Sequence, residues 1–491
     1  MKFNTLYITM PLLLGLIGVR LTVLFVLFYL YVCKKPSVFY VKTARNFFIY
    51  ENTPSLSRRF YPFILGFTPH VQSFFGGIRS KGRNPDQCLK IKAKDGCILT
   101  VDVFEPTNNN PYYTSKEWGV NYKGEDIGVN NKGTKEKGVN NSTNEQQSFN
   151  KGTTNLHLLI NSTNTQHPVS TSTDEQHLVN KTPYKQHPVS TSTDEQHLVN
   201  NTPYKQHPFN DNENSLLNIK PFNYYDSSIP NNVILVHGFN GSSYTSYIRN
   251  LALHLSNENF RVFGFNARGV TNLLESTTFF HIGWTEDLHV LVNYIIDNYT
   301  GYISIIGFSL GGAWTVKISS EITNPRFKCG VAVSVPLDFI KIKEYMLKPV
   351  QRKLYNRMLT NKFKQYFIKN WKVFEKEKFK MKDLLKCQTI QDIDLYFTSK
   401  VFKFKDLESY YEDFSGKKFI PKIKIPFMIL NSVDDPLIPE FSIPKKKCEE
   451  NENIFLVLFS KGGHVGFLGN NFYKTYTEEV VVEFLKAVHE S

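Results

Sequence analysis

A serine in a glycine-rich turn is the first candidate for chemistry in this chain. Ser309 lies in the sequence GFSLGG (307–312), directly after an apolar run and directly before a helical pattern. A serine at a sharp strand-to-helix turn has a strained backbone, and flanking glycines leave room for it. The following helix N-terminus favours negative charge that develops at the hydroxyl. This context predicts a nucleophile, and a helix-capping serine is the alternative.

A serine hydroxyl needs a base to take its proton, and the base needs an orienting acid. His464 lies in a glycine-rich loop, SKGGHVGFLGN, just before the final helical pattern. Asp434 and Asp435 end the preceding apolar run. We choose Asp435 because it stands immediately before Pro-Leu-Ile-Pro, where the chain turns out of the strand, and we expect Asp434 to cap or hydrogen-bond the loop. The order Ser309, Asp435, His464 is the nucleophile, acid and base order of one class of hydrolases.

Two backbone amides complete the candidate site. The run VILVHG (233–238) leads into Phe239, whose N–H is expected beside the serine. Together with the N–H of Leu310, it would form an oxyanion hole. This chemistry needs no metal or organic cofactor, and the sequence signals none.

The elements that must position these groups alternate between short apolar runs and helical patterns. The segment 89–106 alternates on both sides of a Lys-Asp-Gly turn and predicts a β-hairpin. The later strands and helices alternate strictly, which indicates an α/β fold with a mostly parallel sheet covered on both faces. The apolar runs lie at 233–238, 261–269, 302–312, 328–336, 424–435 and 453–460, and the helical patterns include 246–258, 284–299 and 477–490.

The N-terminus carries a long apolar run. Residues 6–33 contain Arg20 as their only charge, and the run exceeds the ~20 residues needed to cross a bilayer. We therefore expect a transmembrane anchor at 6–33 followed by a membrane-proximal segment at 36–88. A cleaved signal peptide is the rival, but the run exceeds a normal hydrophobic region and no small-residue cleavage site follows it. The expected location is a membrane, with a single span whose facing side stays open.

Residues 107–220 differ in composition from the rest. They contain two near-identical units, at 167–186 and 187–206, that are rich in Ser, Thr, Asn and Gln. Such units lack an apolar stripe to bury against a neighbour, so we expect a disordered, low-complexity insertion rather than a solenoid. Six histidines recur here at ten-residue spacing. Metal binding by this ladder is less favoured than repeat expansion, because no close pairing of histidines shapes a site.

Charge and cysteine content narrow the class of protein. The 491 residues contain 58 Lys and Arg against 44 Asp and Glu, a net charge of +14 that invites an anionic partner. No nucleic-acid-binding motif accompanies this charge, so we expect no nucleic-acid partner. The six cysteines form no C-x-x-C pair, which signals neither a zinc site nor a disulfide framework.

Longer motifs support a family resemblance. The chain resembles the membrane-anchored α/β-hydrolase-domain serine hydrolases, a subfamily with mammalian monoacylglycerol- and phospholipid-hydrolysing members, yeast ethanol acyltransferase/esterases and a bacterial hydrolase. The matching segments are HVQSFF (70–75), DGCILTVDVF (95–104), VHGFNGSSYTSYIRNLALHL (236–255), FNARG (265–269), GWTEDL (283–288), GFSLGG (307–312), TIQDIDLYFTSKVFKFKDLESYYEDFS (389–415), NSVDDPLIP (431–439) and GGHVGFLGN (462–470).

The resemblance implies an N-terminal anchor, an α/β-hydrolase fold, a Ser309–Asp435–His464 triad and fatty-acyl ester substrates. We therefore expect the protein to be a membrane-anchored carboxylic ester hydrolase, a lipase or esterase that acts on monoacylglycerol- or phospholipid-like lipids. The expected hydrolase core comprises residues 89–106, 221–340 and 416–490, and the expected lid comprises residues 341–415.

The expected lid is strongly basic. Residues 341–387 carry fifteen Lys and Arg against four acids. Aromatic side chains among these cations suit a surface that rests in lipid headgroups, although ordinary lid helices with solvated outer faces show the same pattern. The aromatic residues are Tyr345, Tyr355, Phe363, Tyr366, Phe367, Trp371, Phe374 and Phe379.

Two alternatives to hydrolysis stay open. Acyl transfer to an alcohol would use the same three side chains. Some relatives carry an H-x-x-x-x-D acyltransferase motif, but here five residues separate His281 from Asp287. A non-enzymatic anchored interaction protein is the other alternative, although a binding module has no use for all three groups of a triad.

Overall fold

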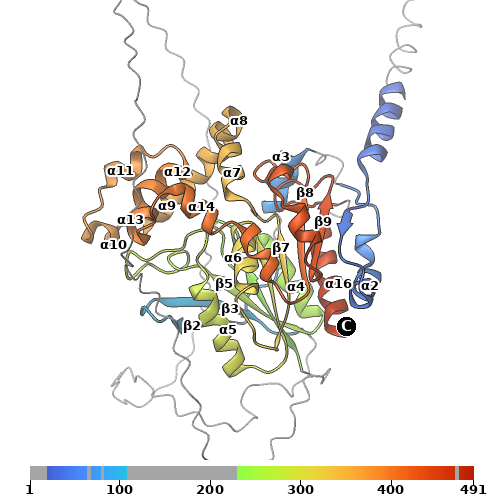
Figure 1. Ribbon diagram of the computed structural model, residues 1–491, viewed down its shortest axis with the longest axis horizontal. Coiled ribbons are helices and arrows are strands. Elements are labelled where there is room, and N and C mark those ends of the chain that lie inside the picture. The colour runs from blue at the N-terminus through green and yellow to red at the C-terminus, as the bar shows by residue number, and fades with distance from the viewer. Residues whose placement is uncertain (1–18, 63–67, 79–81, 108–228, 470–474) are drawn as a thin grey trace, which may run out of the picture. The chain divides into compact units, whose positions relative to one another are not determined.

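The computed structural model describes residues 19–62, 68–78, 82–107, 229–469 and 475–491. Within these residues nine strands form one sheet, in the order β1-β9-β8-β7-β6-β4-β5-β3-β2 (Figure 1). Strands β4 to β9 run parallel to one another, whereas β1, β2 and β3 pair antiparallel with their neighbours. The predicted α/β fold with a mostly parallel sheet is confirmed. The strands are β1 Ser37–Phe39, β2 Gln87–Lys92, β3 Ile98–Phe104, β4 Asn231–Val236, β5 Phe260–Asn266, β6 Ile303–Phe308, β7 Phe327–Val333, β8 Phe427–Ser432 and β9 Ile454–Phe459.

Helices surround the sheet and fill the connections between strands. The four long helices of the core are α4 Ser246–Asn257, α5 Glu286–Asn298, α6 Leu310–Ser319 and α16 Tyr476–Glu490. The N-terminal segment contributes α2 Ala44–Glu51, η1 Pro54–Leu56 and α3 Pro69–Ile78. The connection from β8 to β9 contains η6 Glu440–Ser442 and α15 Lys445–Glu449. The connection from β7 to β8 contains α7 Phe339–Met346, α8 Pro349–Gln351, η2 Arg352–Asn356, α9 Arg357–Lys369, α10 Trp371–Lys376, α11 Met381–Lys386, α12 Ile390–Ile393, η3 Asp394–Thr398, α13 Ser399–Phe402, α14 Leu407–Asp413, η4 Gly416–Lys418 and η5 Ile420–Lys422.

Alternate residues of each central strand enter different cores. In β4, Val233 and Leu235 pack in a cluster with residues of α4 and α16. Ile234 and Val236 pack in another cluster with residues of α5 and α6. Successive side chains of a strand point to opposite faces, so both faces of the sheet are buried beneath helices. This burial explains why the strands read as nearly continuous apolar runs.

The N-terminal segment joins the same sheet. Strand β1 pairs antiparallel with β9, opposite Leu456–Leu458. Helix α2 packs against α16, as Figure 1 shows near the C-terminus. The sequence assigned no element to residues 36–88 before the hairpin. The structure places β1, α2, η1 and α3 there.

The predicted single-pass membrane location is contradicted, whereas residues 6–18 of the predicted anchor at 6–33 lie outside the described residues. Over the stretches of chain set out above, no helix is both long and apolar enough to cross a membrane. The described helix in this region occupies residues 19–32. The predicted insertion at 107–220 lies outside the described residues apart from Thr107, and so does its histidine ladder.

The basic segment between β7 and β8 is helical, and its aromatic residues face inward. Helices α9 to α13 lie together beside the sheet (Figure 1). Phe363, Phe367 and Phe374 are buried in the core cluster that contains α5. Their rings stack edge-on around Phe279, with ring centroids 5.0 to 6.2 Å from it. These aromatic side chains therefore pack against the body of the protein and do not form an outer surface.

Candidate active site

The structure brings Ser309, His464 and Asp435 into one hydrogen-bonded chain. The Nε2 atom of His464 lies 2.9 Å from the Oγ of Ser309. The Nδ1 atom of the same ring lies 2.8 Å from the Oδ2 of Asp435. With Nδ1–H donating to the carboxylate, Nε2 is left with a lone pair directed at the serine hydroxyl. This arrangement can accept a proton from Ser309.

Ser309 occupies a strained turn between β6 and α6. Its backbone has φ 53° and ψ −118°, outside the conformations that non-glycine residues favour. Its N–H donates to the carbonyl of Val333 on the neighbouring strand at 2.9 Å. A Cβ on Gly307 would overlap the Gly311 carbonyl oxygen, and a Cβ on Gly311 would lie 2.5 Å from the carbonyl oxygen of Val236. Both glycines are required because backbone passes directly beside them.

Asp435 is held at the end of β8 in a buried turn. Its side chain has no exposed surface, and its Oδ1 accepts hydrogen bonds from the amides of Leu437 at 2.8 Å and Ile438 at 3.1 Å. These two amides fix the carboxylate so that Oδ2 points at His464. The neighbouring Asp434 serves the loop instead, since its Oδ1 accepts a hydrogen bond from the amide of Gly463 at 3.0 Å. Asp435 therefore contacts the ring of His464, whereas Asp434 contacts the backbone of the loop.

The loop that carries His464 is anchored by residues that the sequence did not single out. The amide of His464 donates to the Oγ of Ser73 at 2.8 Å, and the amide of Val465 donates to the Oγ of Ser334 at 3.0 Å. Ser334 itself has φ 49°. A serine directly after β7 with no helix behind it was the available signal for Ser334. Ser73 lies within the motif at 70–75, which gave no indication of its partner.

Phe239 and Leu310 lie on the two turns that flank Ser309. Leu310 begins α6, so its amide has no acceptor within the helix. Within the described ranges, neither the Leu310 nor the Phe239 amide donates a hydrogen bond to the protein. The adjacent Gly238 would place a Cβ 3.2 Å from the Cβ of Ser309, so this turn passes close to the serine. Both amides are thus available to an oxyanion.

Buried polar groups fix the turn that contains Phe239. The ring of His237 contacts the Gly238 carbonyl through Nδ1 at 2.7 Å and accepts the Ala267 amide through Nε2 at 3.1 Å. This pattern assigns the proton to Nδ1. Burial lowers the pKa of His237 to about 4, which keeps the ring neutral. The hydroxyl of Tyr247 accepts the Gly238 amide at 2.9 Å.

His281 and Asp287 have other partners. His281 is buried among aromatic rings and accepts the Gly283 amide at Nδ1 at 3.1 Å. Burial lowers its pKa to about 3. Asp287 binds the guanidinium of Arg268, with Oδ2 2.8 Å from Nε. His281 and Asp287 therefore contact separate partners and do not contact each other in the hydrogen bonds described for them.

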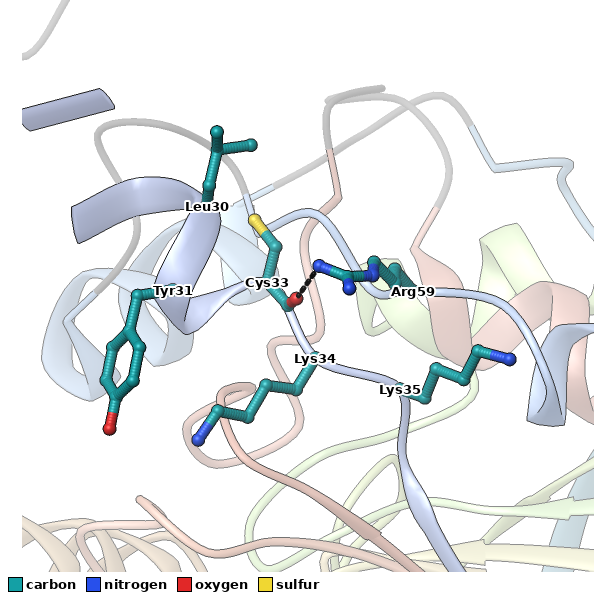
Figure 2. Close-up of a pocket in the computed structure, with 6 residues that line it drawn as sticks. All are labelled: Leu30, Tyr31, Cys33, Lys34, Lys35 and Arg59. Carbon is teal, nitrogen blue, oxygen red and sulfur yellow. Dashed lines mark hydrogen bonds between the residues drawn. The ribbon is translucent and has the colours of Figure 1, made fainter. Parts of the chain in front are cut away.

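A separate hollow lies near the N-terminal helix. It has a volume of about 350 Å³ and is lined by Leu30, Tyr31, Cys33, Lys34, Lys35 and Arg59 (Figure 2). The cationic ends of Lys34 and Lys35 point away from each other, and the Arg59 side chain is directed at the Cys33 carbonyl. The hollow contains none of Ser309, Asp435 and His464. Its cations do not converge on a single point.

Comparisons with known proteins identify the family of the chain. The alpha/beta hydrolase fold family model matches residues 231–470. The chain is 32% identical over 288 residues to the phospholipase ABHD3 of Bos taurus, which covers 57% of this chain and 68% of that protein. It is 28% identical over 267 residues to the monoacylglycerol lipase of Saccharomyces cerevisiae, covering 52% and 59%. It is 27% identical over 282 residues to the monoacylglycerol lipase ABHD2 of Homo sapiens, covering 52% and 65%. The chain belongs to the alpha/beta hydrolase fold family, in the group that contains these relatives.

Proposed function

We propose that this chain hydrolyses fatty-acyl carboxylic esters with Ser309 as nucleophile, His464 as general base and Asp435 as the orienting acid. One observation carries the proposal: the Ser309–His464–Asp435 hydrogen-bond chain ends on a serine held at φ 53°. The comparisons confirm the broader class, a lipase or esterase, since the relatives are named phospholipase and monoacylglycerol lipase.

The proposed reaction has two halves. Ser309 Oγ attacks the acyl carbonyl as His464 Nε2 takes its proton, and the amides of Phe239 and Leu310 hold the oxyanion. His464 then gives the proton to the departing alcohol, which leaves an acyl-serine. Water repeats the sequence with His464 as base and releases the fatty acid. Asp435 stabilises the imidazolium that forms in both halves.

We further propose that residues 341–415 act as a lid over this site. Contacts between this segment and the site support the assignment. The ring of Phe363 on α9 packs edge-on against Phe239, with centroids 5.0 Å apart. Tyr355 on η2 hydrogen-bonds His70 of α3 and lies close enough to Asp435 that the carboxylate helps burial to raise the pKa of Tyr355.

An exposed aliphatic stripe supports a lipid-facing role for the lid. Leu347 lies in the turn between α7 and α8, and Val350, Leu354 and Met358 follow it at helical spacing. The four side chains are 41%, 59%, 54% and 42% exposed. Lysines and arginines flank them in the segment with fifteen cations and four acids. Apolar side chains beside cations suit contact with an aggregated anionic lipid, so the proposed substrates are monoacylglycerol- or phospholipid-like esters.

The Ser309→Ala variant tests the catalytic assignment. We expect a fluorophosphonate probe to label the wild-type protein at Ser309 and to leave Ser309→Ala unlabelled, with ester hydrolysis reduced at least ~10³-fold. Ser320→Ala is the matched control, because Ser320 lies just past the far end of α6 and bonds only the Lys317 carbonyl there. Full labelling of Ser309→Ala would refute the proposal.

A second pair of variants tests the stripe. We expect Leu354→Asp to lower hydrolysis of esters in anionic vesicles about tenfold and to leave a soluble short-chain ester unaffected. Leu385→Asp is the control, since Leu385 is 57% exposed on α11 but lies outside the stripe. Equal losses on both substrates would argue against lipid contact.

We also propose that residues 107–220 are an insertion without a catalytic role. The alpha/beta hydrolase fold family model matches residues 231–470, and this range begins after the segment 107–220. Deleting 112–218 is expected to retain esterase activity within a few-fold of wild type. Loss of activity in a protein that still labels at Ser309 would assign the segment to substrate capture.

A further inference from the structure

We propose that Gln72 and Ser73 of helix α3 are positioning residues that hold His464 in line with Ser309 and Asp435. This inference rests on the function proposed above, because it concerns the same histidine. Nothing in the catalytic chemistry requires a residue from the N-terminal segment. The contacts of α3 nevertheless lie directly on the loop that carries the base.

The backbone of the His464 loop adopts strained conformations. Gly463, Val465 and Phe467 have φ values of 60°, 60° and 45°. A positive φ is ordinary for glycine but strained for valine, which is branched at Cβ, and for phenylalanine. Conformations of this kind persist only where the surroundings determine them. The loop therefore depends on its external partners.

Ser73 supplies the partner of the catalytic histidine's own backbone. Its Oγ accepts the His464 amide at 2.8 Å and donates to the Pro69 carbonyl one turn earlier in α3 at 2.7 Å. Because the hydroxyl proton is committed to Pro69, a lone pair faces the histidine amide. The hydrogen bond fixes the backbone atom from which the imidazole extends.

Gln72 forms hydrogen bonds with Leu468, at the other end of the His464 loop. Its Oε1 accepts the Leu468 amide at 2.7 Å, and its Nε2 donates to the Leu468 carbonyl at 3.1 Å. Gln72 is fully buried, so an unpaired amide there would be costly. One turn of α3 thus holds residues 464 and 468 together, with both strained residues between them.

Close packing prevents the loop from sliding along α3. A Cβ on Gly463 would lie 2.8 Å from the Oγ of Ser73 and 3.0 Å from the Cβ of Gln72. A Cβ on Gly466 would lie 2.6 Å from the Gln72 carbonyl oxygen. The glycines allow the helix and the loop to meet at backbone distance. A shift of either one would break the hydrogen bonds of Ser73 and Gln72.

Loss of the contacts from α3 should affect catalytic turnover rather than substrate binding. His464 must keep Nε2 at Ser309 and Nδ1 at Asp435 at once, and a displacement of about 1 Å can reduce catalysis ~10²-fold. Substrate binding does not require this alignment. Loss of either positioning residue should lower kcat and leave KM unchanged. The motif at 70–75, whose role the sequence left open, acquires a function in this way.

The test compares Ser73→Ala and Gln72→Met with wild type on a soluble short-chain ester. We expect kcat and the rate constant of fluorophosphonate labelling to fall about ten- to a hundredfold, with KM unchanged. Ser73→Thr, which keeps the acceptor oxygen, should restore most of the rate. Ser57→Ala is the matched control, since Ser57 donates to a proline carbonyl as Ser73 does but is exposed and lies outside α3.

Two further measurements separate positioning from folding. Active-site titration gives the fraction of competent Ser309, and a kcat loss that merely tracks this fraction would overturn the inference. In histidine-selectively ¹⁵N-labelled protein, the Nδ1–H resonance of the His464–Asp435 bond should weaken in Ser73→Ala and persist in Ser57→Ala. If wild-type Ser309 is not labelled, the proposed function fails. The resonance then decides the positioning inference alone: an unchanged signal in Ser73→Ala would refute it.

Discussion

The turn that carries Ser309 and the loop that carries His464 both use positive φ angles, but they are supported in different ways. Ser309 is fixed by the consecutive elements β6 and α6, by Gly307 and Gly311, and by the adjacent strand β7. The His464 loop is held by Ser334 and by helix α3, nearly 400 residues earlier in the chain. The nucleophile is therefore shaped by neighbouring sequence, whereas the base depends on distant contacts.

The largest effect that separates the two regions should come from Gly311→Ala. The new Cβ would lie 2.5 Å from the Val236 carbonyl oxygen and would overlap that of His237, both of which are fixed backbone atoms. We expect a loss of about 3 kcal/mol in the free energy of unfolding, measured by urea denaturation. Labelling of Ser309 should fall as well.

Gly96→Ala is the control for this substitution. Gly96 also has a positive φ, of 88°, but a Cβ there meets nothing within 4 Å. Only the backbone preference is lost, which should destabilise the protein by about 1 kcal/mol. An equal loss in the two variants would mean that steric overlap at the nucleophile turn is relieved by movement of β4.

Acid should lower the free energy of unfolding by a smaller amount, through His237 in the turn next to Ser309. Burial lowers the pKa of His237 to about 4 in the folded protein, from about 6.5 when unfolded. The stabilisation is complete above pH 6.5 and is lost as pH falls toward 4, since the unfolded chain binds the proton first. At pH 4.5 the loss from His237 amounts to about 2 kcal/mol.

This loss is measured as the change in unfolding free energy between pH 7.5 and 4.5, in wild type and in His237→Gln. The difference isolates His237, because His281 and His489, whose pKa values burial lowers to about 3, are common to both proteins. Gln72, Ser73 and Ser334 do not titrate. An identical pH dependence in the two proteins would exclude His237 as the acid-sensitive group.

The smallest effect concerns strain in the His464 loop. Val465→Gly removes a partly buried side chain but also relieves a φ of 60°, so the unfolding free energy should change by less than about 1 kcal/mol. Val482→Gly is the control, because Val482 is partly buried in the same cluster but lies within α16. Val482→Gly should lower the free energy of unfolding by about 2 kcal/mol. Equal losses would mean that the contacts of α3 leave no strain at Val465.

The strands after residue 230 and the long helices between them could be predicted from the sequence because their signals are local. Apolar runs of strand length alternate with helical patterns, and each predicted strand from 233 to 460 corresponds to an observed strand. The order of Ser309, Asp435 and His464 along the chain sufficed to nominate three side chains that the structure brings within hydrogen-bonding distance. Ser309 directly follows β6, Asp435 lies three residues after β8 and His464 lies five residues after β9, and parallel strands end at one edge of a sheet.

The remaining features depended on contacts that no local pattern encodes. Strand β1 has three residues, too few to show alternation, and its partner β9 lies more than 400 residues later. The partners of Gln72 and Ser73 are equally remote. In the basic segment, spacing identified aromatic residues but not which way they face. Phe363, Phe367 and Phe374 are buried, whereas Leu347, Val350, Leu354 and Met358 are exposed. The anchor was predicted from the apolar run and from the family resemblance, but among the described residues no helix is long and apolar enough to cross a membrane.

The pairing of β1 with β9 has a consequence for solubility during folding. Strand β9 reads IFLVLF, six apolar residues without charge, proline or glycine, and it would be the last parallel strand on its side of the sheet. An uncovered edge of this composition is a template for aggregation between chains. Strand β1 occupies that edge through Ser37, Val38 and Phe39. Residues 37–39 therefore prevent β9 from pairing with another chain. A variant that lacks residues 1–39 should precipitate at concentrations at which the full chain stays in solution.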